Sequence, residues 1–140
     1  RTKRGNNNTW CRDDELSSFP WEQVKARRDT LHLTKRLIAL RKAFPFAEKG
    51  HILWHGTEPG KPDHSWTSHT LAWEYPTVPS EENGYAARVY AAANMYSEPL
   101  AFTLPRGRWR LQFSARGPES GEEVSGSIEC PPGSVFILSK

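Results

Sequence analysis

The stretch Arg-Trp-Arg-Leu-Gln-Phe at residues 108–113 decides the fold class of this chain. Its large apolar residues alternate with its polar ones, so Trp109, Leu111 and Phe113 share one face of an extended strand. Such alternation predicts an antiparallel strand with one face on a core and the other in solvent. A second stretch, Ser-Val-Phe-Ile-Leu at residues 134–138, is apolar almost throughout. It predicts a strand that is buried on both faces.

Similar short runs of apolar and β-branched residues recur from residue 51 onward. Clusters of Gly, Pro, Ser and Asn, which favour turns, separate the runs at 51–54, 70–75, 87–93, 100–104, 108–113 and 134–138. This spacing predicts an antiparallel β-sandwich that begins near residue 50. We expect the strand residues Trp54, Trp73 and Trp109 in its core. Trp66 lies in a connection rich in Gly and Pro, and we expect it at the surface.

Residues 20–44 follow the period of a helix instead. Apolar residues recur at the spacing of one helix face: Leu33, Leu37, Leu40 and Phe44. Asp29 or Thr30 is expected to cap the start of the regular helix. Pro45 is expected to end it, because proline lacks an N–H group and disfavours helical geometry at the residue before it.

Composition and charge limit the classes of partner. The length of 140 residues allows one domain, or a small domain with part of another. The formal net charge of the chain is +3. Residues 1–49 carry 12 Lys and Arg against 6 Asp and Glu. Most of this excess lies on the predicted helix, where we interpret it as a solvated face and expect no nucleic-acid partner. No apolar run approaches the ~18 residues of a membrane span, and residues 1–8 lead into no secretory signal, so we expect no membrane partner.

The cysteines and histidines offer little for metal chemistry. Cys11 and Cys130 are too few for a disulfide scaffold or a four-cysteine zinc site, and we expect two unpaired, buried or half-buried thiols. His51 and His55, with two further histidines nearby, present imidazoles that zinc could bind. On a strand, however, residues four apart are separated by about 13 Å. We therefore expect no metal site and no cofactor.

The polar stretch at residues 5–16, Gly-Asn-Asn-Asn-Thr-Trp-Cys-Arg-Asp-Asp-Glu-Leu, is the candidate binding loop. Asparagine amides donate and accept hydrogen bonds and carboxylates accept them, a mixture that suits vicinal hydroxyl groups. An indole beside them offers a flat apolar face for a sugar ring. The candidate substrate-binding residues are Asn6, Asn7, Asn8, Trp10 and Asp13. A loop of Asx turns that satisfies its own backbone is the competing interpretation.

This loop and two later segments resemble a known family. GNNNTWCRDDEL is followed by LTKRLIALRKAFP at residues 33–45 and by WHGTEPGKPDHSWTSHTLAWEY at residues 54–75. The set resembles isoamylase-type, plant-like starch and glycogen debranching enzymes of the α-amylase superfamily. The resemblance implies a mainly β chain. Residues 1–49 would be the last loop and eighth helix of an incomplete (β/α)8 barrel, and residues 50–140 the C-terminal antiparallel β-sandwich.

The resemblance also implies a chemistry that this chain does not carry alone. The family hydrolyses α-1,6-glucosidic branch linkages with retention, using an aspartate nucleophile, a glutamate acid and a supporting aspartate. In the family these residues lie before the position of Arg1, so we expect no catalytic residue here. Asp13, Asp14 and Glu15 do not replace them, because adjacent residues on one loop cannot flank a sugar from two sides.

The implied partners are the missing N-terminal catalytic barrel and a branched α-glucan, namely glycogen, amylopectin or limit dextrin. The implied compartment is the cytoplasm, or the plastid stroma in a plant or alga.

One alternative function stays open at this stage. Six tryptophans in 140 residues also suit a stand-alone carbohydrate-binding β-sandwich module, whose exposed indoles would stack on α-glucan. A third class, RNA binding through the basic helix, lacks the interleaved aromatic residues that stack on bases.

Overall fold

The chain forms a helical segment followed by a β-sandwich. The structure is a computed structural model that describes residues 18, 20–45, 51–77, 87–116 and 120–140. The chain divides into two compact units, Arg1–Ala39 and Leu40–Lys140. None of the helices among the described residues has the length and apolar character needed to cross a membrane.

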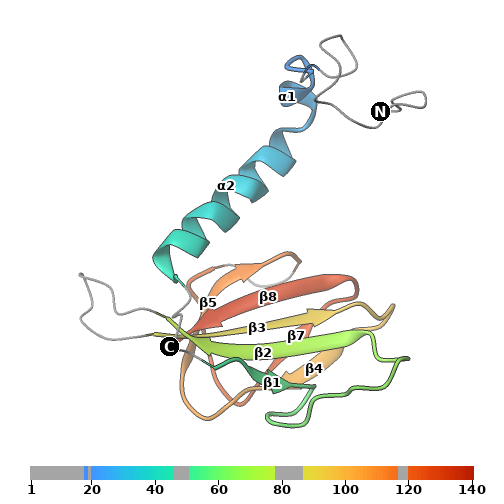
Figure 1. The fold of residues 1–140 in the computed structure, drawn as a ribbon, viewed down its shortest axis with the longest axis vertical. Coiled ribbons are helices and arrows are strands. Elements are labelled where there is room, and N and C mark those ends of the chain that lie inside the picture. The colour runs from blue at the N-terminus through green and yellow to red at the C-terminus, as the bar shows by residue number, and fades with distance from the viewer. Residues whose placement is uncertain (1–17, 19, 46–50, 78–86, 117–119) are drawn as a thin grey trace. The chain divides into compact units, whose positions relative to one another are not determined.

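Two helices follow each other along the chain, α1 at Gln23–Ala26 and α2 at Arg28–Ala43 (Figure 1). The prediction that α2 ends before Pro45 is confirmed. The predicted cap at Asp29 or Thr30 is wrong, because the helix already begins at Arg28. Asp29 instead lies in the first turn, where its carboxylate interacts favourably with the helix dipole.

The second unit contains a six-stranded and a two-stranded antiparallel sheet (Figure 1). The larger sheet has the order β1-β2-β3-β8-β5-β6, and the smaller one pairs β4 with β7. The strands are β1 Leu53–His55, β2 Thr70–Pro76, β3 Arg88–Asn94, β4 Leu100–Thr103, β5 Trp109–Ser114, β6 Glu123–Val124, β7 Ser127–Cys130 and β8 Ser134–Ser139. All six predicted strand runs are therefore confirmed as strands.

The two sheets enclose one hydrophobic core. Trp109 and Leu111 of β5 point into it while Arg110 points to solvent, as the alternation predicts. Phe102 of the small sheet meets Phe136 of the large sheet edge-on, with ring centroids 5.7 Å apart. The core cluster comprises Ala72, Tyr90, Ala92, Phe102, Leu104, Trp109, Leu111, Ile128, Cys130, Phe136 and Leu138.

Strand β8 differs from its prediction on one face. Phe136 and Leu138 are buried in the core, but Val135 and Ile137 on the other face are only half-buried. The prediction of burial on both faces is therefore wrong. The register aligns Ile137 with Ala91, Trp73 and Trp54 of the neighbouring strands, which makes an apolar row across the outer face of the large sheet.

Two strands, β6 and β7, were not predicted. β7 alternates buried Ile128 and Cys130 with exposed Ser127 and Glu129, but the run is only four residues long. The Cys130 thiol is free and buried, as expected, and burial raises its pKa. Cys11 lies outside the described residues.

Candidate functional site

The loop that the sequence singles out is not among the described residues. Asn6, Asn7, Asn8, Trp10 and Asp13 all lie within residues 1–17. Their assignment as substrate-binding residues thus stays a prediction. The described residues nevertheless contain three groups with chemical potential: a buried polar cluster, a set of tryptophans, and an apolar groove between the helices.

The polar cluster surrounds Glu74, which is the one buried carboxylate among the described residues. Glu74 points inward from β2, and Arg88 of β3 donates from Nε to its Oε1 atom. His55 of β1 places Nε2 at 3.6 Å from Glu74 Oε2, beyond hydrogen-bond distance. The other ring nitrogen of His55, Nδ1, accepts the backbone N–H of Gly60 at 2.8 Å.

Burial shifts the pKa values of two groups in this cluster, His55 and Tyr90. Burial lowers the pKa of His55, against the opposing effect of Glu74, so the imidazole is neutral at neutral pH. Burial raises the pKa of Tyr90, whose ring lies 5.6 Å from that of His55. A retaining glycosidase needs two carboxylates about 5 Å apart on either side of a sugar. Glu74 has no second buried carboxylate beside it among the described residues, so this cluster does not match that arrangement.

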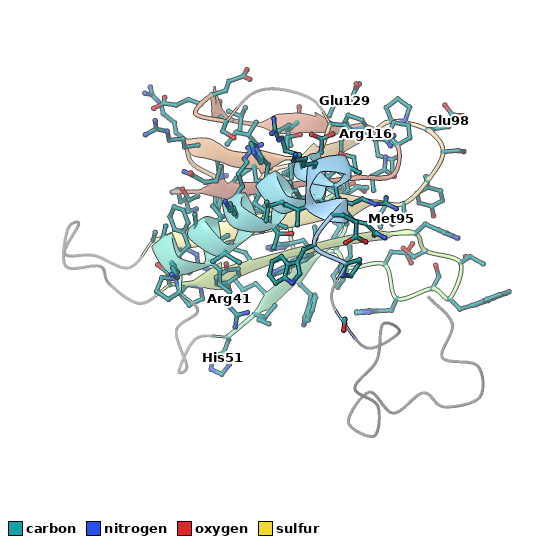
Figure 2. The ribbon with its side chains drawn as sticks, turned by 90° about the horizontal axis from the view of Figure 1, so that it is seen from above. Arg41, His51, Met95, Glu98, Arg116 and Glu129 are labelled. Atoms are coloured by element: carbon teal, nitrogen blue, oxygen red, sulfur yellow. The ribbon has the colours of Figure 1, made fainter. Side chains whose placement is uncertain are left out.

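The histidines do not assemble a metal centre in the described part of the chain. His51 is exposed and projects away from the strands (Figure 2), whereas His55 is buried. His69 uses Nδ1 to contact the carbonyl oxygen of Thr67 at 2.7 Å. Within residues 18, 20–45, 51–77, 87–116 and 120–140, no three His, Cys, Asp or Glu side chains are grouped to hold a metal ion.

The tryptophans divide between core and surface. Trp109 is fully buried and donates from Nε1 to the carbonyl oxygen of Pro105 at 2.8 Å. The prediction that Trp54 and Trp73 lie in the core is wrong. Trp54 is 47% exposed, and Trp73, its partner on the neighbouring strand, is half-buried on the outer face of the sheet. Trp54 neighbours inward-pointing His55 on edge strand β1 and therefore faces the outer side of the sheet. The prediction that Trp66 is exposed is confirmed, at 95%.

Trp66 lies on the long connection between β1 and β2, beside the connection between β3 and β4. Figure 2 labels Met95 and Glu98 on the latter connection. The hydroxyl of Tyr96 donates to the carbonyl oxygen of Thr67 at 3.4 Å, which ties the two connections together. The sequence pattern predicts the exposure of Trp66 but not a role for Tyr96, which lies in an ordinary turn between two strands.

The helical unit carries a groove with mainly apolar walls. It is lined by Pro20, Gln23, Val24, Arg27, Thr30, Leu31 and Thr34. Apolar walls without convergent polar groups suit packing against protein better than the recognition of a polar ligand.

Comparison with known proteins identifies relatives of most of the chain. No protein-family model matches it. The chain is 33% identical over 112 residues to the chloroplastic isoamylase 1 of Oryza sativa subsp. japonica, covering 74% of this chain and 13% of that protein. It is 30% identical to the isoamylase of Flavobacterium sp., covering 75% of this chain and 16% of that protein. A glycogen debranching enzyme of Dickeya chrysanthemi is 29% identical, with coverages of 81% and 18%.

Solved structures share the fold. The pullulanase of an Anoxybacillus species, in complex with maltotriose, superimposes with a TM-score of 0.65 at 18% identity, covering all of this chain and 19% of that one. The pullulanase of Bacillus acidopullulyticus gives 0.62 at 19% identity, covering all of this chain and 17% of that one. This chain spans less than a fifth of the length of each of these relatives. The mainly β fold and the sequence relationship together assign the chain to the isoamylase-type enzymes of the α-amylase family, as a segment of such an enzyme.

Proposed function

We propose that the chain is the C-terminal part of a debranching glycoside hydrolase that cleaves α-1,6-glucosidic branch linkages. The observation that carries this proposal is the similarity to isoamylases from plants and bacteria over about three-quarters of the chain. The similarity to an enzyme named for glycogen debranching supports a branched α-glucan as the substrate. Glycogen, amylopectin and limit dextrin are the candidate glucans.

In this proposal the two parts of the chain have different roles. Residues 1–49 are the terminal loop and eighth helix of the catalytic barrel, and residues 50–140 are the C-terminal sandwich. Active sites of such barrels lie in the loops that follow the strands. The loop with Asn6, Asn7, Asn8, Trp10 and Asp13 therefore borders the substrate cleft, where its amides bind sugar hydroxyls and Trp10 stacks on a ring.

The catalytic carboxylates of the proposed enzyme belong to its barrel, outside this chain. The plant relatives are named as chloroplastic, which supports the plastid as the compartment of the proposed enzyme in a plant or alga.

The direct test is turnover of a branched glucan by an enzyme that contains this segment. We expect Trp10→Ala to lower reducing-end release from amylopectin without changing the melting temperature, because the indole contacts substrate. Lys35→Ala, on the exposed face of α2, is the matched control and should leave turnover unchanged. The 140-residue chain alone should release no reducing ends. Release by that chain, abolished by a change at Asp13, would contradict the proposal.

A stand-alone α-glucan-binding module is the second candidate, favoured by the exposed indole of Trp66. It predicts tight binding by the sandwich alone. Micromolar affinity for maltoheptaose that survives deletion of residues 1–20 would favour the module over the debranching enzyme. One edge of an incomplete cleft buries too little of a ligand to reach such affinity.

A further inference from the structure

The most exposed large hydrophobic side chain among the described residues is a tryptophan. Trp66 is 95% exposed, whereas the other tryptophans of the sandwich are half-exposed, half-buried or buried. An indole has about 150–250 Å² of surface that it can bury against a partner. While this surface stays in water, the chain does not gain the free energy of burying it, which is large for an indole. Such an exposed side chain marks a contact surface when its neighbours are also arranged for contact.

The turn that carries Trp66 is held by several hydrogen bonds. The backbone N–H of Ser65 donates to Asp63 Oδ1 at 2.9 Å, and the N–H of Ser68 donates to the carbonyl oxygen of Ser65 at 3.0 Å. After Trp66 in the chain, the carbonyl oxygen of Thr67 accepts from His69 Nδ1 at 2.7 Å. The backbone that carries the indole is therefore fixed by hydrogen bonds, so binding costs little backbone entropy.

The second connection brings another aromatic group beside Thr67, the residue that follows Trp66. The N–H of Met95 donates to the carbonyl oxygen of His69 at 2.8 Å, and the ring of Tyr96 lies 5.0 Å from that of His69. Tyr96 also donates its hydroxyl to Thr67, as described above. We call Trp66, His69 and Tyr96 the aromatic platform. All three are exposed, and together they come from both connections.

The polar groups beside the platform are suited to hydroxyl groups. Ser65, Thr67 and Asp63 are exposed, and the hydrogen bonds from Ser65 lower the pKa of Asp63, which keeps its carboxylate ionised as an acceptor. The nearby Lys61 is already paired with Glu58 at 2.6 Å. A stacking surface next to an acidic group disfavours phosphate-bearing ligands, because these ligands need cationic side chains along their binding site. A neutral ring with one apolar face and a rim of hydroxyls, such as a pyranose, fits this arrangement.

We propose that the aromatic platform binds a chain of α-linked glucose, with the Trp66 indole stacked on one sugar ring. The choice of glucan among neutral sugars rests on the proposed debranching function. The binding itself does not need the loop at residues 5–16. Because the platform covers one side of the ligand only, its dissociation constant for maltoheptaose should be about 1 mM, weaker than that of an enclosing cleft.

The test is binding of the full 140-residue chain to maltoheptaose by isothermal titration, with affinity electrophoresis in gels that contain amylopectin. We expect Trp66→Ala to weaken binding at least tenfold and to abolish retardation. Trp54→Ala removes an indole from the outer face of the sheet and is the matched control, expected within twofold of the unchanged chain. Tyr96→Phe keeps the ring but removes the bond to Thr67 and should weaken binding by about twofold to threefold.

Three results would overturn the platform. The first is no binding at about 10 mM maltoheptaose, tenfold above the expected dissociation constant. The second is equal binding by Trp66→Ala and the unchanged chain. The third is self-association that Trp66→Ala abolishes without any glucan binding, which would make the surface a protein contact. Thermal unfolding of each variant verifies its fold, and Trp66→Ala should melt with the unchanged chain because its indole is hardly buried.

A further variant separates the platform from the proposed function. Trp66→Ala should weaken the millimolar binding of the Trp10→Ala chain by the same factor as in the unchanged chain. If Trp10→Ala abolished binding and Trp66→Ala did not, the glucan contact would lie in the N-terminal loop, so the platform would fail while the debranching proposal stood. If Trp66→Ala abolished binding and the longer enzyme did not cleave branch linkages, the debranching proposal would fail and the platform would stand.

Discussion

The helical segment and the β-sandwich use apolar residues in opposite ways. Helix α2 has 16 residues and none of them is buried, although it carries Leu33, Leu37 and Ile38. The sandwich buries comparable side chains completely, with Leu111 and Leu138 at its centre. Since most helical stability in proteins comes from packing of an apolar face, α2 has the sequence of a helix that packs on protein. The sandwich holds the core that the chain needs to fold.

The largest expected effect is a matched pair of leucine truncations. Leu138→Ala removes a fully buried side chain from β8 and should lower the free energy of unfolding by about 2–5 kcal/mol. Leu37→Ala removes the same atoms from an exposed site on α2 and should change it by less than about 0.5 kcal/mol. Urea unfolding followed by circular dichroism measures both. Equal losses would show that α2 shares the core of the sandwich.

The second expected effect concerns the buried carboxylate. Arg88→Met removes the partner of Glu74 and should lower the free energy of unfolding by about 2–3 kcal/mol. This lies below the usual loss for a fully buried pair, because the Arg88 side chain is 38% exposed and water screens part of the interaction. The double variant Arg88→Met with Glu74→Gln should recover part of the loss, since no charge is left buried. A double variant no more stable than the single one would contradict this account.

The third expected effect is that the free energy of unfolding of the sandwich depends on pH through His55. His55 titrates at 6.5 when unfolded, and burial lowers its pKa in the folded chain. As the pH falls below 6.5, the unfolded chain binds a proton first, so stability falls until the pH passes the folded pKa. A single group contributes at most about 1.4 kcal/mol per pH unit. His55→Gln should remove this acid-side slope in unfolding measured between pH 7 and pH 5, and an unchanged slope would assign it to other groups.

Residue alternation predicted the fold well where one face of a strand meets the core and the other meets solvent. Strand β5 has this environment, and its inward Trp109 and outward Arg110 were both predicted from the sequence. Alternation did not predict burial correctly where the outer face of the sheet is itself apolar. Ile137 and Trp54 are as apolar as core residues, but they lie on the outer face of the larger sheet.

Short strands, helix ends and the candidate binding loop are harder to predict from the sequence, for a different physical reason. β7 has four residues, too few for its alternation of Ile128 and Cys130 to stand out from a polar connection. The predicted start of α2 is two or three residues too late, because capping depends on backbone geometry rather than on residue type alone. The role of Trp10 depends on the rest of a cleft, which the sequence of one loop does not encode.

The measurement that tests this contrast most directly is thermal unfolding of the chain without residues 1–45. The core of the sandwich lies entirely within residues 72–138. We therefore predict a soluble β-domain that unfolds in one cooperative transition, at a melting temperature close to that of the 140-residue chain. Loss of cooperative unfolding on this deletion would contradict the account, because it would show that the helical segment is part of the core that folds the sandwich.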